Sequence, residues 1–210
     1  MINIDSGDNG LSFKTNGLRD MLGHEILASV SEPELSDECR KFVRFVCDYV
    51  ATGHPIRPEE TIGYGYWITK AVVNDGGDLE FWEYTPDASH YVPGVSNTLR
   101  YWRDQHQVCE LASSVFAPPQ ADQMIVISDG VYEGENVQGV RYPSPPHMSG
   151  WWLTTDRYDG NVDSLKTVHL YHLTERRADL AKFVALSPGY RFYSDNGEVR
   201  FDRKALNSTP

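Results

Sequence analysis

Residues 137–155, with the sequence VQGVRYPSPPHMSGWWLTT, constrain the fold of this chain more than any other stretch. Three of the four residues 143–146 are prolines, which exclude a helix and remove backbone donors from a sheet ladder. The segment therefore predicts a fixed elbow between two extended runs. Trp151 and Trp152 follow directly after Gly150, and adjacent residues of a strand point to opposite faces. We expect one tryptophan, Trp151, in the core, and its neighbour facing solvent or a partner.

Composition narrows the class of protein. The chain has 210 residues, enough for one large core or two small domains. Its net charge of -11 argues against nucleic-acid binding, because phosphates would be repelled, and favours plain solubility or a basic partner. Cys39, Cys47 and Cys109 are odd in number and widely spaced, which predicts neither a disulfide framework nor a zinc site. With no secretory signal and no membrane-length apolar run, we expect a cytoplasmic protein without cofactor, metal or membrane partner.

Helical and strand-like patterns alternate along the chain. Residues 31–53 predict an amphipathic helix that Ser31 caps and that Pro33 enters at its first turn. The remaining elements are a hairpin of residues 62–73 and 79–84, a helix at 96–112, strands at 124–127, 137–142, 151–155 and 167–173, a helix at 174–186, and a hairpin of 190–193 and 198–201.

These elements predict an α+β fold, with mainly antiparallel sheet or sheets and about three packed helices. Residues 1–30 are rich in Asn, Asp, Gly and Ser, so we expect a poorly ordered or loosely packed segment. Residues 31–120 then form a helix–hairpin–helix half, residues 121–203 an α+β half, and residues 204–210 a tail. We expect the two halves to make one compact unit.

Histidines offer weak signals for chemistry. His169 and His172 are three apart on a predicted strand, so they point to opposite faces and cannot share a metal without distortion. His147 lies in the elbow with Asp156 nearby in sequence, and a histidine with a carboxylate could act as a base. No nucleophile motif accompanies them.

A pair of acidic residues suggests a second possible catalytic site. Glu80 and Glu83 flank two aromatic residues, as acids of a glycosidase cleft could, but their spacing on a strand also points them to opposite faces. A small hydrolase or carbohydrate-active enzyme using His147 and nearby carboxylates is therefore one alternative. A non-catalytic scaffold or regulatory binding domain is another.

The sequence around the elbow resembles that of a known protein family. GVRYPSPPHMSGWWLTT, the strand VHLYHL at 168–173 and the segment PGYRF at 188–192 resemble a predicted bacterial family of polymorphic-toxin immunity proteins. That family was first filed as a domain of unknown function and is numbered thirty-third in its series. A tryptophan after a glycine is its marker, and Gly150-Trp151 matches it. ETIGYGYW at 60–67 and YWRDQH at 101–106 resemble its longer members, so that the likeness covers about residues 58–201.

The resemblance implies a cytoplasmic α+β antidote, not an enzyme, which binds and neutralises a toxin delivered by a neighbouring cell. It brings no catalytic residues and no cofactor. The residues themselves are compatible, because a toxin-binding protein needs rigid strands, aromatic anchors and charge opposite to that of its partner. The cognate toxin is then the expected partner, and a basic toxin is favoured. We predict partner-binding side chains around the elbow: Arg141, Tyr142, His147, Trp151 and Trp152.

Overall fold

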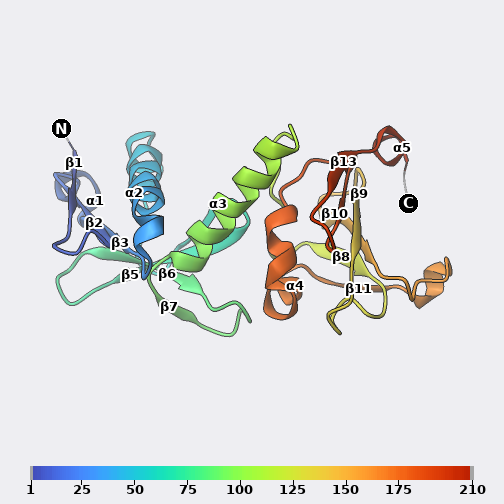
Figure 1. Cartoon of the computed structure of the whole chain (residues 1–210). Coiled ribbons are helices and arrows are strands. Elements are labelled where there is room, and N and C mark those ends of the chain that lie inside the picture. The colour runs from blue at the N-terminus through green and yellow to red at the C-terminus, as the bar shows by residue number, and fades with distance from the viewer. Residues whose placement is uncertain (1, 209–210) are drawn as a thin grey trace. The chain divides into compact units, whose positions relative to one another are not determined.

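The computed structural model describes residues 2–208 and divides into two compact units, Met1–Arg103 and Asp104–Pro210. The division falls inside helix α3 (Ser96–Leu111), earlier in the chain than the expected one near residue 120. Each unit is built on one sheet with helices beside it, which confirms the α+β class (Figure 1). No helix within residues 2–208 is both long and apolar enough to cross a membrane.

The sheet of the first unit combines antiparallel pairings with one parallel pairing. β3 and β6 run parallel, whereas the other neighbours are antiparallel. The order across the sheet is β1 (Asn3–Ser6), β2 (Ser12–Asn16), β3 (Ile26–Ser29), β6 (Leu79–Tyr84), β5 (Trp67–Val73) and β4 (Thr61–Tyr64), with β7 (Tyr91–Pro93) also paired to β6. The predicted strand 62–73 is thus two strands, because the chain turns at Gly65 with a positive φ of 63°.

Helix α2 (Ser36–Ala51) packs against β1, β2 and β3 (Figure 1). It follows a short 3-10 turn, η1 (Pro33–Leu35), which confirms Pro33 at the entry. Ser31 does not cap the helix as predicted, because its backbone N–H and hydroxyl are hydrogen-bonded to Ser96. The apolar face is buried as its spacing predicts, and Phe42 meets Phe81 edge-to-face with ring centroids 5.2 Å apart.

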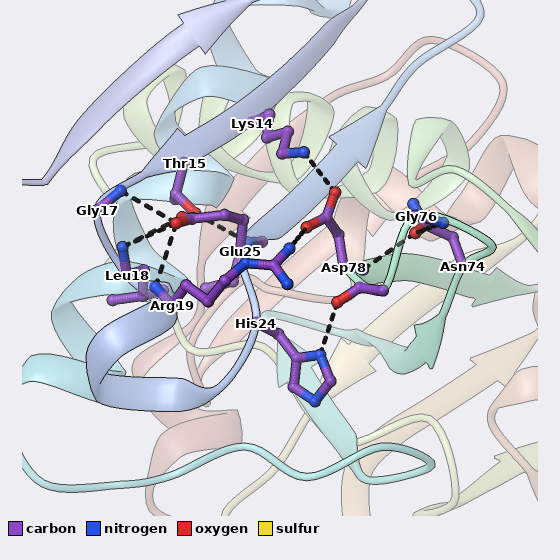
Figure 2. Close-up of polar contacts among 12 residues, drawn as sticks. Lys14, Thr15, Gly17, Leu18, Arg19, His24, Glu25, Asn74, Gly76 and Asp78 are labelled. Atoms are coloured by element: carbon purple, nitrogen blue, oxygen red, sulfur yellow. Dashed lines mark hydrogen bonds and ion pairs between the residues drawn. The ribbon is translucent and has the colours of Figure 1, made fainter.

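The N-terminal segment is ordered, contrary to the expectation for residues 1–30; residue 1 lies outside the described residues. It supplies β1, β2, the short helix α1 (Arg19–Leu22) and β3. The Glu25 carboxylate organises it (Figure 2): it accepts hydrogen bonds from Thr15 Oγ1 at 2.6 Å and from the backbone N–H groups of residues 17–19. The polar composition therefore marks turns and a buried polar centre in this segment.

Asp78 ties this segment to the turn before β6 (Figure 2). Its side chain is almost fully buried and accepts hydrogen bonds from Arg19 at 2.6 Å and from Lys14 at 2.5 Å. The Asn74 side chain accepts from the backbone N–H groups of Gly76 and Asp78. The turn is thereby fixed where both cations can reach it.

The sheet of the second unit also contains one parallel pairing, between β10 and β8. "Mainly antiparallel" therefore describes neither sheet completely. The order is β11 (Lys166–His169), β8 (Met124–Ile127), β10 (Met148–Thr154), β9 (Gln138–Arg141), β12 (Tyr190–Tyr193) and β13 (Val199–Phe201). The hairpin of β12 and β13 agrees with the prediction from the Asn-Gly turn.

The predicted helix 174–186 is replaced by two short pieces, α4 (Tyr171–Arg176) and the 3-10 helix η3 (Ala178–Phe183). The break is at Arg177, whose φ of -141° is not helical. Its guanidinium donates to the carbonyls of Val131 and Glu135 and pairs with Asp179, and these bonds fix the departure from the helix. The count of about three helices is therefore not matched: α2 and α3 are long and the others are single turns or little more.

The C-terminal tail is partly structured. Asp202 caps the short helix α5 (Arg203–Leu206) by accepting from the N–H groups of Lys204 and Ala205, whereas residues 204–210 were expected to form only a tail. Residues 209 and 210 lie outside the described residues. A further 3-10 turn, η2 (Val162–Ser164), lies in the loop before β11.

We predict that Glu25→Gln lowers the melting temperature at neutral pH. We also expect the melting temperature of the variant to decrease less than that of the wild type as the pH is lowered. Burial alone would raise the pKa of Glu25, but the hydrogen bonds from Thr15 and from the N–H groups of residues 17–19 outweigh it and lower the pKa. The stabilisation is therefore present above the unfolded-state pKa and is lost as pH falls through the lowered one. An amide accepts these bonds less well, at a cost of about 1.5–3 kcal/mol.

Thermal melts of wild type and variant between pH 7 and pH 3 check this. Glu34→Gln, which changes an exposed acid, is the matched control and should follow the wild type. Parallel pH profiles for wild type and Glu25→Gln would contradict the role given to Glu25.

Candidate protein-binding surface

The elbow joins β9 to β10 and is closed by its own backbone. The N–H of Met148 donates to Pro145 O at 2.9 Å, and the Ser144 hydroxyl donates to Met148 O. The N–H of Met124 donates to His147 O, which fastens the elbow to β8. Three prolines and these bonds leave the exposed residues 143–147 as a firm, water-facing rim.

A bulge follows the elbow and decides which way each tryptophan points. The register between β10 and β8 shifts between Met148 and Trp152, and Gly150 lies in this interval with φ of 81°. A Cβ on Gly150 would lie 2.2 Å from the carbonyl oxygen of Tyr142. Both the conformation and the contact require glycine. The bulge at Gly150 therefore determines to which side of the sheet the side chains of Trp151 and Trp152 point.

Trp151 points into the core of the second unit. It is 1% exposed, and its indole Nε1–H donates to Val184 O at 2.9 Å. Its ring lies 5.3 Å from that of Phe192, which in turn stacks on Phe183 at 4.2 Å. Residues 178–186 therefore cover this inner face of the sheet, as the prediction of a core Trp151 requires.

Arg141 lies on the same inner face, because it is the cross-strand partner of Trp151. Its Nε–H donates to Ser149 O at 2.9 Å, and Nη1 donates to the carbonyls of Ala117 at 2.6 Å, Leu186 at 2.5 Å and Val184 at 3.2 Å. Burial lowers the pKa of Arg141 to about 10, so that it is still charged at neutral pH.

The buried positions of Arg141 and Trp151 correct the predicted contact set. Neither side chain reaches solvent enough to touch a partner in this conformation. Arginine and tryptophan are common contact residues, which is why both were placed on the surface patch. Here they hold the sheet on its support. Tyr142, His147 and Trp152 are not buried, and their role in binding stays a prediction.

The opposite side of the sheet carries a half-exposed surface, which we call the outer face and define as Tyr142, Trp152, Thr154, Gln138 and Tyr193. Trp152 is paired with Val140, and Thr154 with Gln138, which in turn pairs with Tyr193. Directly opposed residues share a face, so these side chains form neighbouring rows. Tyr142 meets Trp152 edge-to-face with centroids 6.0 Å apart.

The outer face has an aromatic centre and a polar border, which is the usual anatomy of a protein contact surface. Val126 and Val140, each 7% exposed, are the cross-strand partners of Trp152 on its two neighbouring strands, so that the indole lies between apolar neighbours. Thr154, Gln138 and Tyr193 were missed in the sequence. Thr154 could have been found, because side chains two residues apart on a strand share a face and Thr154 is two residues after Trp152. Gln138 and Tyr193 join this face only through strand pairings that the sequence does not reveal.

The residues considered for catalysis do not converge. His147 precedes the seven-residue strand β10 and Asp156 follows it, which separates them by roughly 20 Å or more. Glu83 is buried and accepts from the N–H groups of Asn97 and Thr98 and from the Thr98 hydroxyl, so that it caps α3. Burial raises its pKa against the effect of these bonds.

No metal centre is formed by the part of the chain that the structure describes, since no three His, Cys, Asp or Glu side chains gather to hold an ion. His169 ends β11 and His172 lies in α4, with ring centroids 6.5 Å apart. Cys39, Cys47 and Cys109 are buried free thiols.

Comparison with known proteins gives a family match within the second unit. Residues 104–202 match the family model of the Imm33-like domain. This confirms the resemblance to an immunity-protein family for that part of the chain, whereas residues 58–103 of the expected likeness lie outside the match. No curated protein and no solved structure matches the chain.

We predict that replacing the two tryptophans lowers stability by unequal amounts. Trp151→Ala should cost about 3–5 kcal/mol, because it leaves a core cavity and removes one of the two donors to the Val184 carbonyl. Trp152→Ala removes a half-exposed side chain and should cost clearly less. Chemical denaturation of both variants measures the difference; equal losses would place the two rings in the same kind of environment.

We also predict that Gly150→Ala destabilises more than Gly134→Ala. Both glycines have positive φ, of 81° and 91°, so that alanine costs about 1–2 kcal/mol at either from backbone strain. Only Gly150 adds a clash, with Tyr142 O, which should cost about 1–3 kcal/mol more, whereas nothing lies within 4 Å of a Cβ on Gly134. Denaturation curves that coincide for the two variants would contradict the bulge as the reason for Gly150.

Proposed function

We propose, from the match of residues 104–202 to the Imm33-like domain, that this protein is a cytoplasmic immunity protein that binds and neutralises a bacterial protein toxin one-to-one. The match is the observation that carries the proposal. Inhibition then follows from occupancy alone, because a stable complex covers or distorts the toxin's own site and needs no chemistry from the antidote.

The outer face is the surface we assign to this contact. It supplies a half-exposed tryptophan between two buried valines, a second aromatic ring at 6.0 Å, and a polar border. Energetically dominant contact residues are enriched in tryptophan and tyrosine, so Trp152 and Tyr142 are the proposed anchors. His147 on the elbow adds a donor or acceptor at the rim.

The surface is also suited to binding because it is already ordered. Residues on paired strands lose little freedom when a partner arrives, and the prolines of residues 143–146 restrict the elbow beforehand. The expected complex therefore forms without large rearrangement of the second unit.

The enzyme alternative has no comparable support. His147 and Asp156 lie at opposite ends of β10, and Glu83 is engaged in capping α3. A scaffold or regulatory domain without a toxin partner would share the outer face, and only a binding and protection experiment distinguishes it.

We predict that the purified protein forms a one-to-one complex with the product of the neighbouring open reading frame and protects cells that express that product. Trp152→Ala should weaken the complex by about 30-fold or more, as loss of a central aromatic anchor does. Calorimetry and a growth assay measure both effects.

Tyr49→Ala is the matched control, because it removes an exposed aromatic from α2, outside the Imm33-like match. It should leave affinity unchanged. Absence of both complex and protection for the wild-type protein would overturn the immunity function, and full affinity of Trp152→Ala would remove the outer face from it.

A further inference from the structure

A small polar pocket lies at one end of the outer face, where β10 and β12 end and β9 begins. Its volume is about 190 Å³. The lining residues that matter here are Asn136, Gln138, Thr154, Asp156, Tyr193 and Asp195. Three of them, Gln138, Thr154 and Tyr193, belong to the outer face, so the pocket is continuous with the proposed contact surface.

The pocket carries negative charge that the unit does not neutralise. The carboxylates of Asp156 and Asp195 take part in no hydrogen bond or ion pair with any residue between 2 and 208. Some other acids of the same unit are paired with a cation: Asp129 pairs with Lys166, and Glu135 with Arg157. None of the lining residues is basic.

One cation does lie near the rim. Arg200 donates to the Tyr193 hydroxyl, which also accepts from the Gln138 side-chain amide at 3.2 Å. A single positive charge does not cancel two carboxylates, and the guanidinium is already used by the ring and hydroxyl of Tyr193. The pocket therefore keeps a net preference for a cationic guest.

Its size excludes most small-molecule ligands. Sites for such ligands typically measure about 300–1,000 Å³ and are mostly apolar, whereas this one is smaller and polar. A single long side chain of a protein partner fits a cavity of this scale. Because no third His, Cys, Asp or Glu joins the two acids within the described residues, a metal site is not formed.

We propose that this pocket receives an arginine side chain of the toxin, an inference that rests on the proposed immunity function. The planar guanidinium has five N–H donors and no acceptor. The pocket offers matching acceptors: the two carboxylates and the side-chain oxygens of Asn136 and Gln138. A lysine would present one point charge and satisfy fewer of them.

The position of the pocket gives the partner a defined pattern. Trp152 and Thr154 are two residues apart on one face of β10, which is about 7 Å along the strand. We therefore expect the toxin to place an apolar or aromatic patch on Trp152. Its arginine would lie about 7 Å from that patch, measured along β10. The two contacts form one continuous surface.

Binding of the toxin to pocket variants tests the inference. Asp156→Asn and Asp195→Asn keep the shape and remove one charge each, and the double variant should weaken binding by about 10- to 100-fold. Asp163→Asn is the matched control, an exposed acid of the same unit that does not line the pocket, and should bind as the wild type does. Equal affinity of the double variant and the control would overturn the pocket assignment.

A probe without toxin separates this inference from the proposed function. Titration with N-acetyl-arginine amide should shift the backbone amide resonances of Gln138, Thr155 and Tyr193, whereas the neutral citrulline analogue should not. If the wild type binds no toxin but arginine amide shifts these resonances, the immunity function fails and the pocket's preference stands. If toxin binds, and arginine and citrulline amides behave alike, the function stands and the pocket inference fails.

Discussion

The second unit depends on how one buried cation is satisfied. Arg141 forms no ion pair with any residue that the structure describes, and its guanidinium is instead surrounded by the carbonyl oxygens of Ser149, Ala117, Val184 and Leu186. A buried charge is costly unless its donors are used, and a carbonyl cage uses them without a second charge. The planar, branched donor set of arginine reaches three separate chain segments at once, which a lysine could not do.

This cage also explains why the elbow and the two tryptophans lie as they do. Arg141 and Trp151 are cross-strand partners, so the bond from Trp151 to Val184 and the cage fix the same inner row of the sheet. In a strand, fixing one row fixes the alternate row on the other side, because a slip of one residue would reverse every side chain. Trp152 is thereby directed outward by what happens on the inner face. Gly150 makes the change of register possible just before this pair.

The sequence predicts the elements that are governed by local periodicity, and little of what depends on distant partners. The long helices α2 and α3 and the hairpin of β12 and β13 follow from spacing and turn residues. The strands at the N-terminus were missed because they depend on contacts with distant residues. β3 is held by its parallel pairing with β6, and Glu25 accepts hydrogen bonds from donors up to ten residues away. The broken helix at Arg177 was missed because its cause is a set of carbonyls more than forty residues earlier.

At the candidate surface too, the sequence predicts what local spacing determines and misses what depends on distant contacts. Alternation predicts one tryptophan inside and one outside, and Arg141 was grouped with the contact residues because arginine is common at protein interfaces. Only the folded chain shows that carbonyls from three other segments, at residues 117, 149 and 184–186, make an interior position favourable for it. The pocket next to Thr154 could not be predicted either, since Gln138 and Tyr193 meet there through β9 and β12.

Charge acts on two length scales in the proposed complex. Residues 104–202, which match the family model, contain 14 acidic and 8 basic residues, and the rest of the chain contains 16 and 11, so that the negative excess is spread over both parts. At physiological salt, charges farther apart than about 8 Å are largely screened, and this excess mainly speeds encounter with a basic partner. The carboxylates of the pocket act at contact distance, where desolvation and hydrogen bonding determine how long the complex lasts. Added salt should therefore slow association far more than it shortens the lifetime of a formed complex, and the two contributions can be separated because they belong to different residues.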